Sequence, residues 1–161
     1  MHQAVHFRSQ VTIYACAADE LEKGLLLNQT WKDAAEHRQF QENFCESLRN
    51  LQDRQSGDTA AQTLKRFVTA AEGLNQLAPD SVPAVYYLAK AHRLQVQPML
   101  IDINPTNRPS VSKQLGDTAS AVKSTMESAQ SGTLPEWNRF ADNYRRLSID
   151  LSNLMQAAQC P

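Results

Sequence analysis

The chain has 161 residues, of which 42% are hydrophobic and 20% charged, and its formal net charge is −1. This length is enough to bury a sizeable core without disulfides, and the low net charge argues against a disordered chain. Ala, Leu and Gln are the commonest residues, whereas there are only four Ile and five Gly. Such a composition favours helices and is atypical of β-sandwiches and of Gly-rich nucleotide-binding folds.

The first half of the chain predicts a short arm and three helices. Residues 1–10 are expected to form a flexible arm. Apolar residues three or four positions apart then predict a helix over residues 11–28. A capping signal at Thr30 predicts a second helix that ends in the polar stretch after residue 51. Asp58 is expected to cap a third helix, which ends before Pro79.

The second half predicts three more helices and one long connection. A helix over residues 82–96 is apolar on most sides, as is typical of a central helix in a bundle. Residues 98–110 contain three prolines and are expected to be a long, Pro-rich, non-helical connection. Helices over residues 110–131 and 135–155 follow. The sequence therefore predicts an all-α fold, a single-domain bundle of about six helices over residues 1–161.

The sequence contains no motif typical of catalysis or of metal binding. It holds no nucleophile elbow, no HExxH, no phosphate-binding loop and no GxGxxG, so we expect no enzyme, no catalytic residue and no metal site. Cys16, Cys45 and Cys160 are odd in number and widely spaced, which favours reduced thiols and a cytoplasmic location. The short apolar patch Val11–Ala18 leaves secretion as an alternative. No apolar run is long enough to span a bilayer, and no membrane partner is expected.

His92 lies within the fourth expected helix. The stretch Leu88–Pro98 around it resembles the haem-ligand helix of globins and the turn that follows, and Leu134–Tyr144 resembles the start of a globin's last helix. The resemblance implies a haem-binding protein with His92 as the axial ligand. The chain departs from the globin pattern in the short segment after Trp31 and in the long connection after His92. The alternative interpretation of His92 is a histidine at the rim of a packed core.

Four apolar residues stand beside the proline-rich turn: Met99, Leu100, Ile101 and Ile103. They either fill a gap at the end of the bundle or form an exposed, strand-like edge that pairs with a partner chain. We take them as the candidate partner-binding residues, because long connections in compact bundles are often functional.

Three functions stay open at this point. The first is a non-enzymatic helical protein–protein interaction module, an adaptor, assembly subunit or inhibitor-type protein, which needs no cofactor and binds another protein or forms a homo-oligomer. The second is a globin-like protein that binds haem through His92. The third is a small helical regulator that contacts nucleic acid. Its Lys and Arg residues are scattered in pairs such as Arg145–Arg146, so nucleic acid is not the expected main partner.

Overall fold

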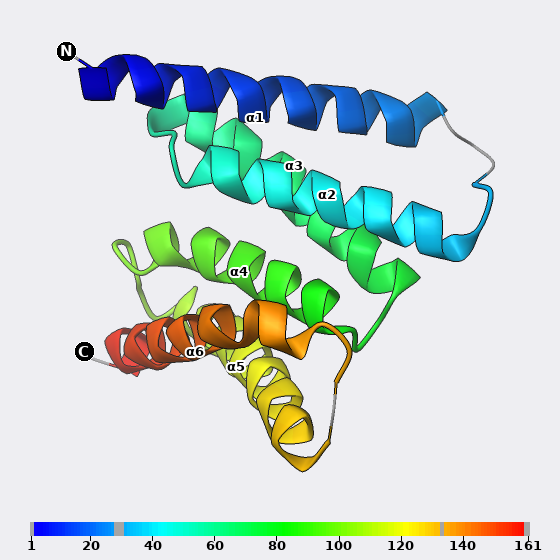
Figure 1. Cartoon of the computed structure of the whole chain (residues 1–161). Helices are drawn as coiled ribbons and strands as arrows, with labels where there is room; N and C mark the ends of the chain where they lie inside the picture. The colour runs from blue at the N-terminus through cyan, green and yellow to red at the C-terminus, as the bar shows by residue number, and fades with distance from the viewer. Residues whose placement is uncertain (1, 28–30, 133, 160–161) are drawn as a thin grey trace. The chain divides into compact units, whose positions relative to one another are not determined.

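The computed structural model describes residues 2–27, 31–132 and 134–159 (Figure 1). These residues form six α-helices and no strand, which confirms the expected all-α fold. The chain divides into two compact units, Met1–Ala78 and Pro79–Pro161. The single domain expected over residues 1–161 stays a prediction. Within the described ranges, no helix is both long enough and apolar enough to cross a membrane.

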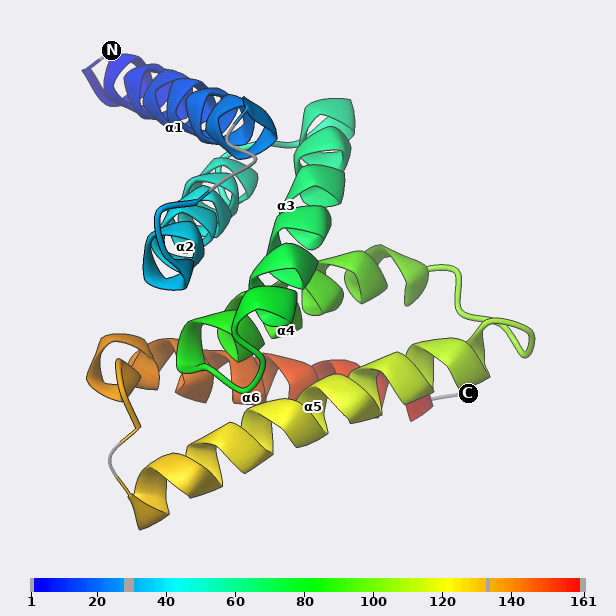
Figure 2. The same ribbon diagram turned by 90° about the vertical axis from the view of Figure 1, so that its right-hand side faces the viewer.

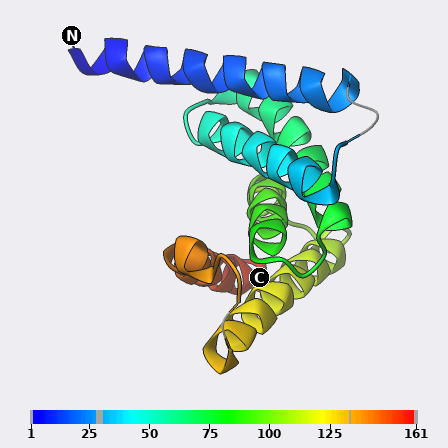
Figure 3. The same cartoon turned by 45° about the vertical axis from the view of Figure 1, so that its right-hand side comes forward.

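The first unit contains three helices, α1 (His2–Leu27), α2 (Ala34–Gln52) and α3 (Gly57–Leu77). Helix α2 is the middle element, because α1 and α3 both pack against it (Figures 1 and 3). Helix α1 begins at His2, so residues 2–10 of the arm expected from the sequence lie in a helix, and the flexibility of the arm stays a prediction. Residues 2–23 contain neither Pro nor Gly, and a helix that is already nucleated therefore extends towards the N-terminus at little cost.

The ends of these helices differ from the expected caps. Asp33 caps α2, since its Oδ1 accepts a hydrogen bond of 2.7 Å from the Glu36 backbone N–H. Thr30, the cap expected from the sequence, lies outside the described residues. Helix α3 begins at Gly57, directly after Ser56, and Gly57 has a left-handed φ of 61°. A residue without a Cβ adopts this conformation at low cost.

The core of the first unit lies mainly between α2 and α3. The buried apolar residues of these two helices follow a spacing of three or four, and they are Phe44, Cys45, Leu48, Leu51, Phe67, Ala70, Ala71 and Leu74. Burial raises the pKa of the Cys45 thiol above its ordinary range, so this cysteine behaves as a small apolar core residue.

The second unit contains α4 (Val82–Met99), α5 (Arg108–Ser131) and α6 (Trp137–Gln159), and each of them packs against the other two. Helices α5 and α6 run in opposite directions (Figure 2). Aromatic rings join α4 to α6: the centroid of Tyr86 lies 5.2 Å from that of Phe140 and 6.0 Å from that of Tyr144. The buried Tyr144 hydroxyl donates a 2.8 Å hydrogen bond to the Val82 backbone oxygen, which ties α6 to the first residue of α4.

The connection between α4 and α5 is shorter than expected. It spans residues 100–107 rather than 98–110, because both flanking prolines belong to helices. Pro98 lies in the last turn of α4, where the missing N–H removes one hydrogen bond and the Leu100 N–H still donates to the Val96 oxygen. Pro109 lies in the first turn of α5, where no intrahelical partner is lost.

The same substitution at two glycines is expected to change stability in opposite directions. A Cβ added at Gly57 or at Gly116 meets no atom within 4 Å, so neither change causes a clash. Gly57→Ala is expected to lower the free energy of unfolding by about 1 kcal/mol, because an L-residue is strained at positive φ. Gly116→Ala, in the interior of α5, is expected to raise it by about 0.5–1 kcal/mol. Urea unfolding followed by circular dichroism measures both, and a stabilising Gly57→Ala would contradict the account of the start of α3.

Candidate functional site

The structure places the predicted partner-binding residues at the end of α4 and on the turn after it. Met99 is the last residue of α4, and Leu100 and Ile101 lie in a turn, so the structure does not form the extended, strand-like edge that was one of the two alternatives left by the sequence. Leu100 and Ile103 are half-buried, whereas Ile101 is 84% exposed and Met99 46%. The partner-binding role of these four residues stays a prediction.

Two asparagines give this turn its shape. Asn104 Oδ1 accepts hydrogen bonds from the backbone N–H groups of Thr106 and Asn107, at 3.0 and 3.1 Å. Asn107 Oδ1 accepts from the Asn104 N–H at 2.8 Å, and both side-chain amides donate to the Asp102 oxygen. These local bonds satisfy the backbone within the turn, which explains why the segment does not adopt an extended edge.

His92 lies on α4 and is half-buried against α5. Its Nδ1 is 3.3 Å from Thr118 Oγ1, and the Thr118 hydroxyl donates its one proton to the Gln114 backbone oxygen at 2.7 Å. Nδ1 is therefore the donor in the His92–Thr118 bond. This bond gives His92 a structural role in joining α4 to α5, and the haem-ligand role implied by the globin resemblance stays a prediction.

His, Cys, Asp and Glu side chains form no group of three that could hold a metal ion in the described part of the chain. Cys16 is exposed and Cys45 is buried, and both are free thiols, whereas Cys160 lies outside the described residues. Surface shape and charge, rather than a set of ligating or nucleophilic groups, therefore distinguish the candidate sites in the described residues.

The first unit contains an open groove, which we call the α1–α3 groove. It has a volume of about 350 Å³ and is lined by residues of all three helices: Glu22, Leu25, Leu26, Gln41, Phe44, Lys65, Arg66, Thr69 and Ala70. It exists because α1 and α3 each pack against α2, and no close backbone approach joins α1 to α3 among the described residues. The buried Phe44 on α2 gives the groove an apolar floor and the buried Ala70 lies on its α3 side, while Leu26 on the α1 wall is 73% exposed.

A double ion pair spans the groove at one level. Arg66 Nη2 on α3 lies 2.8 Å from Asp19 Oδ1 and 2.8 Å from Glu22 Oε2, both on α1. Gln41 on α2 also fixes α3, because its Nε2 donates a 2.8 Å hydrogen bond to the buried Ala70 oxygen. The walls are thus held by polar contacts, and the apolar surface between them stays accessible.

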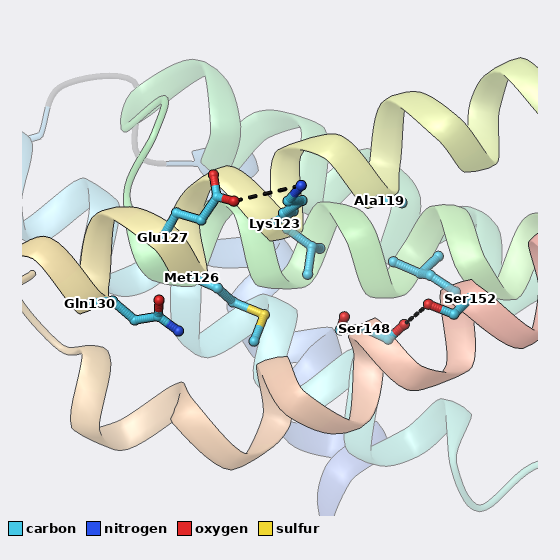
Figure 4. Close-up of a pocket in the computed structure, with 9 residues that line it drawn as sticks. Ala119, Lys123, Met126, Glu127, Gln130, Ser148 and Ser152 are labelled. Atoms are coloured by element: carbon cyan, nitrogen blue, oxygen red, sulfur yellow. Dashed lines mark hydrogen bonds and ion pairs between the residues drawn. The ribbon is translucent and has the colours of Figure 1, made fainter.

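The second unit contains a pocket of about 340 Å³ between α5 and α6 (Figure 4). Val122, Met126 and Leu151 supply its apolar lining, and Ser148 and Ser152 lie on the α6 side. Its charged rim is internally paired, since Lys123 Nζ lies 3.6 Å from Glu127 Oε1. We regard the α1–α3 groove as the stronger candidate, because a large exposed apolar side chain, Leu26, forms part of its wall.

No protein-family model, no curated protein and no solved structure matches this chain. The candidate site is therefore supported by its geometry alone.

The sequence analysis did not identify the α1–α3 groove. The available signal was the run Leu25–Leu27 at the end of the first helix, since three consecutive leucines point to different sides and a helix packed on one face cannot bury all of them. In the structure Leu25 is half-buried, whereas Leu26 and Leu27 are 73% and 82% exposed.

Ile101 and Val96 provide a test of which apolar residues near the α4–α5 turn stabilise the fold. Ile101→Ser is expected to change the free energy of unfolding by less than about 0.5 kcal/mol, because the side chain is 84% exposed. Val96→Ser removes a fully buried side chain and is expected to cost about 2–3 kcal/mol. Thermal and urea unfolding of the two variants make the comparison, and a large loss from Ile101→Ser would show that Ile101 is packed in solution.

Proposed function

We propose that this chain is a non-catalytic helical protein–protein interaction module, and that the α1–α3 groove is its binding site. The observation that carries the proposal is an apolar-floored groove of about 350 Å³ whose wall includes the 73% exposed Leu26. Concave sites of roughly 300–1,000 Å³ are typical of ligand recognition. Exposed apolar surface with a charged rim is typical of an interaction site.

The shape of the groove favours a helical partner. It is lined by all three helices, with α1 and α3 at its sides and α2 between them, and an apolar concave surface of this kind accepts the apolar side chains on one face of another helix. The apolar floor takes the partner's apolar side chains. Arg66 and Glu22 pair with each other across the groove, and the exposed Lys65 places a further positive charge on the α3 rim, where it can attract an acidic group of the partner.

A cytoplasmic location is part of this proposal, and two free thiols in the described residues, Cys16 and Cys45, support it. The haem-binding function that rests on His92 and the nucleic-acid regulator stay predictions.

Binding of the dye bis-ANS tests whether the groove accepts apolar groups in the folded protein. At submicromolar protein concentration, the folded chain is expected to enhance the dye's fluorescence. Leu26→Glu is expected to weaken dye binding about 5- to 10-fold, because it places a charge on the wall of the groove. Ile149→Glu is the matched control: Ile149 on α6 is similarly exposed, at 62%, and does not line the groove.

Cooperative unfolding of wild type and both variants at the same denaturant concentration is the check that the dye reports on the native fold. A folded wild-type protein that leaves the dye's fluorescence unchanged would mean that the groove is closed in solution, and the proposed function would then be wrong. Equal dye binding by wild type and Leu26→Glu would place the dye elsewhere and would also contradict the proposal.

A further inference from the structure

The double ion pair of Arg66 with Asp19 and Glu22, which we call the Arg66 bridge, lies at one end of the α1–α3 groove. The residues that line the groove lie within residues 22–26 of α1 and residues 65–70 of α3. Glu22 and Arg66 thus stand at or next to the N-terminal limit of both ranges, and Asp19 lies one turn further towards the N-terminus of α1. The bridge therefore closes the groove at this end.

We propose that the Arg66 bridge regulates access to the groove. While the bridge is intact, α1 and α3 are held together at this end and the groove is short. When the bridge opens, the two helices can separate there, and apolar groups can enter the groove from that side. This inference rests on the proposed function, because the groove is the proposed binding site, and it adds the contact that regulates that site.

The geometry of the bridge makes it weak. Both carboxylates approach the same nitrogen, Nη2, at 2.8 Å, whereas a guanidinium binds a carboxylate best through two parallel N–H groups. The Nε atom of Arg66 is buried and has no hydrogen-bond partner among the described residues, which costs free energy while the bridge is closed. Asp19 and Glu22 are like charges one turn apart, and their side chains are 56% and 41% exposed, so water and salt compete for them. The bridge can therefore open at little cost.

Separate contacts keep α1 and α3 on α2 when the bridge opens. Helix α1 approaches α2 at Gly24, where the Phe40 ring leaves no room for a Cβ. Helix α3 is held to α2 by the 2.8 Å hydrogen bond from Gln41 to the Ala70 oxygen. No close backbone approach joins α1 to α3 among the described residues. Helix α1 can therefore move relative to α3 at this end without losing its packing against α2.

Binding of Nile red, a neutral apolar dye, tests the proposal without direct attraction between the dye and Arg66. Arg66→Gln is expected to bind Nile red about 3- to 10-fold more tightly than wild type, because the end of the groove is open. Raising NaCl from about 0.05 M to about 0.5 M screens the bridge, and we expect it to tighten binding about 2- to 3-fold more in wild type than in Arg66→Gln.

Arg145→Gln is the matched control. It also removes one positive charge and one exposed ion pair, because Arg145 Nη1 lies 2.7 Å from Asp142 Oδ1, but both residues belong to α6 in the second unit. Its binding of Nile red, and the response of that binding to salt, are expected to equal those of wild type.

Hydrogen exchange followed by mass spectrometry shows where the structure opens. In Arg66→Gln, the backbone amides of residues 10–27 of α1 are expected to exchange about 3- to 10-fold faster than in wild type. The amides of residues 44–51, in the core part of α2, are expected to exchange at the wild-type rate, because α2 keeps its contacts with both neighbours.

Charge reversal separates an ion-pair role of Arg66 from simple packing. Arg66→Glu is expected to open the groove further, because three carboxylates then meet. Adding Glu22→Arg restores an unlike pair between α1 and α3. The double variant is expected to return both dye affinity and α1 exchange to within about 2-fold of wild type, a rescue that lost packing does not predict.

Nile red binding by Arg66→Gln that is equal to or weaker than that of wild type would overturn the proposal. So would α1 exchange that stays unchanged or that rises together with exchange in α2, and so would a Glu22→Arg change that does not rescue Arg66→Glu. These results leave the proposed function in place as long as folded wild type binds bis-ANS. A folded wild-type chain that binds neither dye loses the proposed function, and hydrogen exchange then still decides whether Arg66 holds α1 to α3.

Discussion

The middle position of α2 is the constraint on which the architecture of the first unit depends. Helix α1 approaches one side of α2 closely at Gly24, where an added Cβ would lie 2.6 Å from the Phe40 ring. Helix α3 is held on another side, where Gln41 donates to the Ala70 oxygen. Because each neighbour occupies its own side of α2, α1 and α3 are left with a groove between them whose floor is α2 itself.

The contact that spans this groove is polar. Arg66 reaches from α3 to Asp19 and Glu22 on α1, and these charged groups are partly exposed. Exposed ion pairs of this kind contribute only about 0.2–1 kcal/mol each. In the second unit the corresponding place is filled by aromatic rings, since Tyr86 on α4 packs against Phe140 and Tyr144 on α6. Each helix of the second unit thus packs against the other two, whereas among the described residues α1 and α3 each pack only against α2.

The existence of all six helices could be predicted from the sequence, because each has apolar residues at helical spacing over many turns. Their ends could not be predicted as well. Pro98 and Pro109 are breakers in isolation, yet the last turn of one helix and the first turn of the next tolerate them. Asp33 is the N-cap of α2. In the sequence it also fits a capping box as the residue three positions after a cap at Thr30, so the pattern alone does not say which of the two residues is the cap.

The candidate site was missed for a different reason. Periodicity identifies which face of a helix is apolar, but it does not say which helices share that face. The groove forms because α1 and α3 both pack against α2. This packing depends on contacts between residues far apart in the sequence, such as Gly24 with Phe40 and Gln41 with Ala70. The geometry of His92 has the same origin, because its bond to Thr118 exists only once α4 and α5 are aligned.

The contrast between the partner-binding residues predicted from the sequence and the groove proposed from the structure follows from shape rather than from hydrophobicity. Around the α4–α5 turn, Leu100 and Ile103 are partly covered and Ile101 alone is strongly exposed, and a single exposed aliphatic side chain is ordinary on a protein surface. The α1–α3 groove combines an apolar floor, an exposed leucine and walls of unlike charge within one small area. Apolar side chains supply affinity only where a concave surface surrounds them and excludes water. For that reason we propose the groove, where the helices leave such a surface, as the recognition site, while a partner-binding role of the turn, where the sequence concentrates apolar residues, stays a prediction.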